Sequence, residues 1–245
     1  MVAEQGGFNP DYVREMIRSA RLQRRIGALG MHTYRDISQE EYAEFMKVAQ
    51  RGLDAGVRLW MSEYGDLDQT GEEEWYVAWA STSRLLGALE AGFNGALVWD
   101  AFDNYHDHDE AWTIYGLLRS GLRMFTPKKR YFAARQVYRY VRPGFQRVAV
   151  SLDVQDVKML GFASPERTQV TLVGYNASPV TVYVNARLTG FDASLTSGKV
   201  GYYRTTEHEN CVKVEERAVS TANYPYAGID VQIPAYSMFT LSNVL

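Results

Sequence analysis

Cysteine is nearly absent from the 245-residue chain, which has only Cys211. A single thiol excludes a disulfide framework and a cysteine-based zinc site. The chain also lacks an apolar run of the roughly 18 residues that a membrane span needs. Residues 1–7 have neither the basic nor the apolar stretch of a signal peptide. We therefore predict no disulfide, no membrane span and no signal peptide in this chain.

An excess of one charge is lacking too, because 26 basic residues stand against 29 acidic ones and no basic stripe occurs. Nucleic acid is therefore not expected as a partner. No glycine-rich dinucleotide motif, P-loop or HExxH zinc motif is present, so no cofactor is predicted. Aromatic residues, by contrast, reach 13%, with 17 tyrosines. They suit stacking on sugar rings, but tyrosine is also common in β-sandwiches, and composition leaves both readings open.

Helix and strand patterns alternate over residues 1–143, which is typical of a parallel sheet with covering helices. Ser38 and Glu41 form a capping box at the start of one helix, and Gly56 and Gly92 end two of them. The expected helices cover residues 10–25, 38–55, 73–91 and 126–140, and the expected strands cover residues 26–34, 57–65 and 95–100.

After residue 143 the pattern changes to short β-branched runs bounded by turns, which predicts an antiparallel β-sandwich. The expected strands cover residues 168–175, 180–188, 200–205, 212–219 and 229–233. We therefore predict an α/β domain over residues 1–143 and an all-β domain over residues 144–245.

The three parallel strands share one property, because each ends in residues that a buried strand does not favour. These residues are His32 and Tyr34, then Glu63, then Trp99 and Asp100. Side chains alternate along a strand, so Glu63 is expected on the same face as Leu59 and Met61. Each residue alone is more often structural than functional. Together they predict a site, because active sites of βα barrels lie at the carboxyl ends of the strands.

Three segments in this order resemble glycoside hydrolase family 30, which includes glucosylceramidases, endo-β-1,6-galactanases, fucosidases and glucuronoxylanases. They are His-Thr-Tyr at 32–34, Leu-Trp-Met-Ser-Glu-Tyr-Gly at 59–65 and Ala-Leu-Val-Trp-Asp at 96–100. They are similar to the sixth, seventh and eighth strands of that family's barrel, and residues 131–148 resemble its passage into a side β-sandwich. The resemblance implies the C-terminal portion of a (β/α)8 barrel followed by an antiparallel β-sandwich.

The resemblance also implies a retaining hydrolysis of β-glycosidic bonds by two carboxylates, with Glu63 as the nucleophile. The family's acid/base glutamate follows the fourth strand. No residue here corresponds to it, because the sequence is expected to begin just before the sixth strand. The isolated chain is therefore expected to be inactive, with a separate N-terminal barrel fragment as a candidate partner. A full-length family member is expected to be extracellular or periplasmic.

A phenol donor such as Tyr34 could hold a nucleophilic carboxylate, His32 could orient Tyr34 or bind a sugar hydroxyl, and Trp99 could form the floor of the cleaved subsite. The residues expected to bind substrate are His32, Tyr34, Tyr64, Trp99, Asp100 and Tyr105.

Some alternatives stay open. An acid/base drawn from Asp66, Asp68, Asp100 or Asp103 would have to reach across the open barrel. Residues 105–110, with two histidines and three acids, fit a solvated loop, a substrate loop or a metal clip, and substrate contact is favoured over metal. This loop resembles galactanase-like members. The main hypothesis is a galactanase-like retaining hydrolase present as a truncated chain, and the alternative is an inactive carbohydrate-binding or structural remnant. A further alternative pairs two copies at their open sheet edges.

Overall fold

The computed structural model describes residues 2–67, 74–103, 115–120, 125–191, 198–220 and 227–244. The chain forms two compact units, Met1–Arg130 and Tyr131–Leu245. The expected domain change at residue 143 falls inside the second unit. Gln136, for example, is fully buried there and bonds through its side chain to Thr205 and Thr240.

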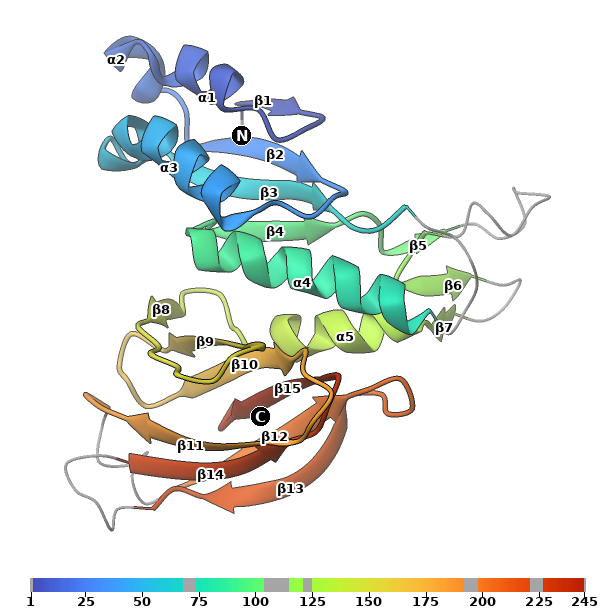
Figure 1. Cartoon of the computed structure of the whole chain (residues 1–245). Coiled ribbons are helices and arrows are strands. Elements are labelled where there is room, and N and C mark those ends of the chain that lie inside the picture. The colour runs from blue at the N-terminus through green and yellow to red at the C-terminus, as the bar shows by residue number, and fades with distance from the viewer. Residues whose placement is uncertain are drawn as a thin grey trace. The chain divides into compact units, whose positions relative to one another are not determined.

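The first unit contains a four-stranded parallel sheet, in the order β1-β2-β3-β4 (Figure 1). Its strands are β1 (Val2–Gln5), β2 (Ala28–Thr33), β3 (Arg58–Tyr64) and β4 (Gly95–Val98). The three predicted strands are confirmed. The expectation that the sequence begins just before the strand at residues 26–34 missed β1, which precedes that strand and pairs with it in parallel. Four residues without an apolar run give β1 no recognisable sequence pattern.

The helices of the first unit are α1 (Pro10–Ile17), α2 (Ala20–Gln23), α3 (Gln39–Asp54) and α4 (Trp75–Ala91). The helix expected over residues 10–25 is split, because α1 ends at Ile17 and Ser19 caps a new helix, α2. The capping box of Ser38 and Glu41 is present, with bonds of 3.1 and 3.0 Å. Gly56 and Gly92 follow α3 and α4 with positive φ angles, a conformation that glycine adopts without strain. No helix in the described part of the chain is long and apolar enough to cross a membrane.

A bulge interrupts β3 just before its carboxyl end. Met31 on β2 pairs with Met61, but the next residue, His32, pairs with Glu63, so Ser62 is an extra residue. On the other side, the pairing with β4 shifts over the same stretch. A bulge changes the phase of side-chain alternation. The expectation that Glu63 shares the face of Met61 is therefore wrong, and Glu63 joins the face of His32 instead.

A small three-stranded sheet follows β4 and was not expected. It consists of β5 (Phe102–Asp103), β6 (Leu118–Ser120) and β7 (Phe125–Pro127). The N–H groups of Leu117 and Leu118 donate to the carbonyls of Asp100 and Ala101, at 2.9 and 3.0 Å. These bonds attach the segment that leads into β6 to the residues that directly follow β4.

The second unit contains a six-stranded antiparallel sheet, in the order β13-β12-β15-β10-β9-β8, and a two-stranded sheet of β11 and β14. The helix α5 (Lys129–Tyr138) spans the junction of the units. The strands are β8 (Gln146–Val148), β9 (Val157–Ala163), β10 (Val170–Asn176), β11 (Val182–Leu188), β12 (Lys199–Thr205), β13 (Val212–Ala218), β14 (Ala227–Ile233) and β15 (Ser237–Ser242).

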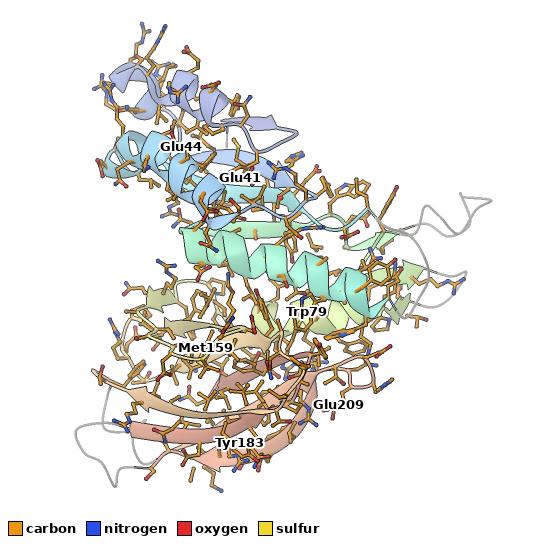
Figure 2. The ribbon with its side chains drawn as sticks, in the orientation of Figure 1. Glu41, Glu44, Trp79, Met159, Tyr183 and Glu209 are labelled. Carbon is orange, nitrogen blue, oxygen red and sulfur yellow. The ribbon has the colours of Figure 1, made fainter. Side chains whose placement is uncertain are left out.

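The two sheets of this unit share one hydrophobic core. Met159 on β9, which is labelled in Figure 2, belongs to the same buried cluster as Phe239 on β15, Val184 on β11 and Val231 on β14. The predicted sandwich and its five strands are confirmed. The central strand β15 was missed, because all six of its residues are buried and no alternation marks it.

Candidate active site

Two side chains converge on one oxygen of Glu63. The Tyr34 hydroxyl donates to Oε2 at 2.6 Å, and His32 Nδ1 lies 3.1 Å from the same atom. The Glu63 side chain is 30% exposed, so the carboxylate is open to a ligand on one side. Among the described residues, Oε1 has no hydrogen-bond partner. The arrangement fixes the carboxylate through Oε2 and leaves Oε1 available for chemistry.

Tyr34 acts as a permanent donor in this arrangement. Burial, and next the hydrogen bond to Glu63, raise the pKa of the Tyr34 phenol far above its usual value. The phenol therefore stays protonated over the whole physiological range. His32 can donate as well when Nδ1 carries a proton, in the neutral ring or in the imidazolium. His32 was expected to orient Tyr34 or to bind a sugar, and it contacts Glu63 directly.

Trp99 presents an aromatic surface next to Tyr34, the residue that binds this carboxylate. Its side chain is 38% exposed, and its ring meets Tyr34 edge to face at 6.3 Å. The Tyr115 ring lies on Trp99 as well, with centroids 5.3 Å apart and an interplanar angle of 45°. The backbone N–H of Trp99 donates to the backbone carbonyl of Tyr64 at 2.9 Å. The peptide bond between Trp99 and Asp100 is cis. Tyr115 was not predicted, because no motif marks it in the sequence.

Gly65 lies where the backbone leaves β3 and passes close to Trp99. A Cβ at this position would lie 2.9 Å from the Trp99 carbonyl oxygen and 3.6 Å from the Tyr34 ring. Only glycine fits this approach without displacing the Trp99 backbone, since the contact with the Tyr34 ring is an ordinary one. The requirement for glycine at the last position of the Ser-Glu-Tyr-Gly motif therefore has a steric cause.

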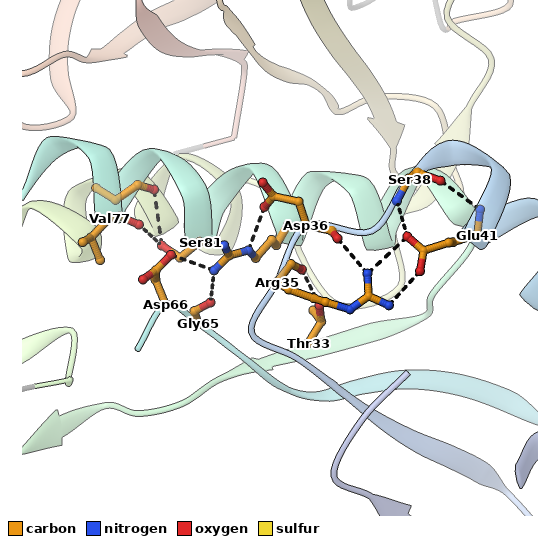
Figure 3. A network of polar contacts seen from close by, with 11 residues as sticks. Thr33, Arg35, Asp36, Ser38, Glu41, Gly65, Asp66, Val77 and Ser81 are labelled. Carbon is orange, nitrogen blue, oxygen red and sulfur yellow. Dashed lines mark hydrogen bonds and ion pairs between the residues drawn. The ribbon is translucent and has the colours of Figure 1, made fainter. Parts of the chain in front are cut away.

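Arg84 on α4 ties together the two loops that follow β2 and β3. Its Nε donates to Asp36 at 2.9 Å, and its Nη1 donates to the Gly65 carbonyl at 2.7 Å and to Asp66 at 2.8 Å (Figure 3). The Arg84 side chain is only 10% exposed. Asp66, a candidate for the acid/base, is held in this ion pair. Arg84 was not predicted, because it lies on a helix remote from the motifs.

No protein-family profile and no curated protein matches the sequence. Among solved structures, the chain matches a family 30 endoxylanase from Clostridium papyrosolvens C71 with a TM-score of 0.75 and 20% identity, over 100% of this chain and 56% of that one. It matches an endo-β-1,6-glucanase with a TM-score of 0.66 and 13% identity, over 97% and 47%. The chain has the fold of part of a family 30 glycoside hydrolase.

The same fold is found more distantly in other glycosidases. An α-L-arabinofuranosidase from Thermotoga maritima matches with a TM-score of 0.62 and 12% identity, over 98% of this chain and 57% of that one. The chain thus spans about half of the length of the structures that it matches. The partial barrel and β-sandwich expected from the family 30 resemblance are confirmed.

Other predicted site residues are placed differently. Tyr64 is 1% exposed and packs in the core, so its assignment to substrate binding is wrong for this structure. It follows Glu63 directly, and alternation turns it to the opposite face. Asp100 is partly buried, and its charge contributes to the raised pKa of Tyr34.

The remaining expectations concern residues 104–114 and 68–73. Tyr105, Asp68 and the histidine-rich loop 105–110 lie outside the described residues, as does the side chain of Asp103. In the described part of the chain, no group of three histidine, cysteine or acidic side chains could hold a metal ion. The loop's role stays a prediction.

Proposed function

We propose that this chain provides the nucleophile of a retaining β-glycoside hydrolase, and that Glu63 is that nucleophile. The observation that carries the proposal is the Glu63 carboxylate, with Oε2 held by Tyr34 and His32 and Oε1 left open. The exposed ring of Trp99 contacts the same Tyr34. The carboxylate lies at the carboxyl end of a parallel strand, where barrels of this kind place their chemistry. The shared fold with family 30 enzymes supports the same conclusion.

In the proposed reaction, Oε1 of Glu63 attacks the anomeric carbon and forms a glycosyl ester while the bond to the leaving oxygen breaks. A second carboxyl group protonates that oxygen and later takes a proton from the attacking water. The Tyr34 and His32 donors keep Oε2 fixed during attack and stabilise the carboxylate charge when the ester is hydrolysed. Trp99 packs against the apolar face of the sugar.

We assign the second carboxyl group to polypeptide that corresponds to the rest of the matched barrel. Asp66 is unsuited to the role because Arg84 binds it at 2.8 Å. Retention requires the two carboxyl groups to lie roughly 5–5.5 Å apart across the sugar. Without that acid, a substrate whose leaving group needs a proton should react about 10²–10⁴-fold more slowly.

The substrate proposed is a β-linked polysaccharide or glycoconjugate. A galactan is favoured by the sequence of the loop at residues 103–110, most of which lies outside the described residues. Two of the matched structures carry the names xylanase and β-1,6-glucanase. A panel of sugars is therefore needed.

The test uses 2,4-dinitrophenyl 2-deoxy-2-fluoro-β-glycosides of galactose, glucose and xylose on the 245-residue chain. Dinitrophenolate departs with the bonding electrons and needs no proton, so the reagent tests the nucleophile without the acid. Fluorine at C2 destabilises the oxocarbenium-like transition state and slows loss of the label. We expect a mass increase of one fluoroglycosyl group, mapped to Glu63 by peptide sequencing.

Two variants make the labelling experiment decisive. Glu63→Gln should take up no label, whereas Glu44→Gln, at an exposed glutamate on α3, should be labelled as the wild type is. Labelling at another carboxylate, or none with all three sugars, would refute Glu63 as the nucleophile.

An inactive carbohydrate-binding remnant is the second candidate, and one observation favours it. Trp99 is an exposed platform, while no second carboxyl group in the described residues has been placed opposite Glu63. A chain that binds β-linked oligosaccharides by calorimetry but takes no label at Glu63 would support this candidate.

A further inference from the structure

The ring of Trp99 contacts the rings of two tyrosines. Tyr34, which also holds Glu63, meets it edge to face at 6.3 Å, and Tyr115 lies against it at 5.3 Å. Trp99 is 38% exposed, so these contacts leave part of its surface open. The orientation of the exposed Trp99 ring therefore depends on the positions of the two tyrosine rings.

The backbone of Tyr115 is fixed by a buried ion pair. Arg130 Nη1 donates to the Tyr115 carbonyl, and Arg130 Nη2 lies 3.0 Å from Glu74 Oε2. The two charged side chains are 4% and 3% exposed. Glu74 is the residue that precedes α4, so the pair connects the start of that helix to the Tyr115 segment.

A buried ion pair is a poor source of stability, because removing two charges from water offsets most of their attraction. Such pairs can instead specify geometry. The planar guanidinium has donors in a rigid fork, and here two of them reach two different acceptors. A backbone hydrogen bond near this pair also anchors the segment that contains Tyr115, since the Lys128 N–H donates to the Leu117 carbonyl at 3.0 Å.

We propose that Tyr115, held by the Glu74–Arg130 pair, is a positioning residue that sets the angle of the Trp99 ring as the sugar platform. This inference rests on the proposed function of the site. Tyr115 acts through Trp99, whose ring it contacts. Its loss should weaken sugar binding while the attack by Glu63 on bound sugar proceeds at its normal rate.

Sugar binding and the attack by Glu63 can be measured separately with the dinitrophenyl fluoroglycoside that labels Glu63 fastest. The dependence of the labelling rate on its concentration gives a binding constant and a first-order rate constant. In Tyr115→Leu, we expect the binding constant to weaken about three- to tenfold, the loss typical of one aromatic contact. The first-order rate constant should change less than about twofold. Tyr115→Phe keeps the ring and should behave as the wild type.

The ion pair is tested by changing both partners together. A single Arg130→Met would leave the buried Glu74 charge unpaired and could unfold the chain. The double variant Glu74→Met and Arg130→Met removes both charges and should keep the wild-type melting temperature. It should still weaken binding as Tyr115→Leu does.

Fluorine NMR checks the environment of the Trp99 ring in the absence of sugar. The protein is produced in cells supplied with 5-fluorotryptophan, and the Trp99 fluorine signal is assigned by its loss in Trp99→Phe. We expect this signal to move in Tyr115→Leu and in the double variant, and to stay in Tyr115→Phe.

Unchanged binding and an unmoved Trp99 signal in Tyr115→Leu would overturn the inference while labelling of Glu63 still supports the proposed function. An unmoved signal in the double variant alone would overturn the role of the ion pair. If the wild type takes no label, the proposed function fails, and the fluorine signals decide whether Tyr115 fixes the indole.

Discussion

Gly65 is the residue where a single added methyl group should disturb the candidate site most directly. A Cβ at this position would lie 2.9 Å from the carbonyl oxygen of Trp99, which is closer than a normal van der Waals contact. That oxygen belongs to the backbone, so it cannot rotate away as the end of a side chain could. The Gly65→Ala variant must therefore displace the chain at Trp99 or at its own position.

The size of the effect follows from the cost of overpacking. Forcing one extra methyl group into a packed position typically costs about 1–3 kcal/mol. In a chain of this length, each kcal/mol lowers the melting temperature by roughly 2–4 °C, so a decrease of about 2–12 °C is expected. The Tyr34 ring lies 3.6 Å from the same Cβ, which is an ordinary van der Waals contact. Its bond to Glu63 should be disturbed only through Trp99, whose ring Tyr34 meets edge to face.

The matched control is Gly27→Ala. Apart from its chain neighbours, no atom of the described residues lies within 4 Å of a Cβ at Gly27, and the φ angle of Gly27 is not in the positive region. This variant should keep the wild-type stability or gain about 0.4–1 kcal/mol, because alanine restricts the unfolded chain. Both variants are compared by thermal unfolding and by the rate at which Glu63 takes up the fluoroglycosyl label.

The reasoning is refuted if Gly65→Ala unfolds at the temperature of Gly27→Ala and is labelled at the wild-type rate. That result would mean that the two strand ends can separate freely. A loss of labelling without a loss of stability would place the disturbance in the site alone.

Three further outcomes are expected. Tyr34→Phe should slow labelling of Glu63 by about tenfold or more, because the carboxylate loses part of its orientation; an unchanged rate would mean that the imidazole alone holds it. The Arg35 side chain lowers the pKa of Glu41 to about 2, so its support for the first turn of α3 is complete above about pH 4.5 and is lost as the pH falls toward 2. An NMR titration checks this, and Arg35→Gln should raise the midpoint. Asn176→Ala should cost about 2–5 kcal/mol in denaturant unfolding, because the fully buried carboxamide donates to three carbonyls and accepts two bonds.

Features with local causes could be predicted from the sequence. The capping box of Ser38 and Glu41 depends on residues three positions apart, and the helix ends at Gly56 and Gly92 depend on one backbone angle each. The order of strands and the approach of Tyr34 to Glu63 followed from the parallel pattern and the family 30 resemblance.

Features that depend on distant partners could not be predicted. The bulge at Ser62 exists only in the pairing of β3 with its two neighbours, so the sequence placed Glu63 on the wrong face. Arg130 and Glu74 are 56 positions apart and become partners only in the folded chain. The fully buried strand β15 lacks the alternation by which a half-buried strand is recognised.

The extra residue at Ser62 has a consequence for engineering. Deleting Ser62 would place Glu63 directly after Met61, so regular alternation would keep the carboxylate on the face of His32. A glutamate grafted two positions after the residue that matches Met61, on a strand without the bulge, would instead share the face of Met61 and point away from His32. A scaffold intended to carry this chemistry must therefore receive either the insertion or a glutamate placed one position earlier, since the register of the strand decides which of two adjacent side chains meets the ligand.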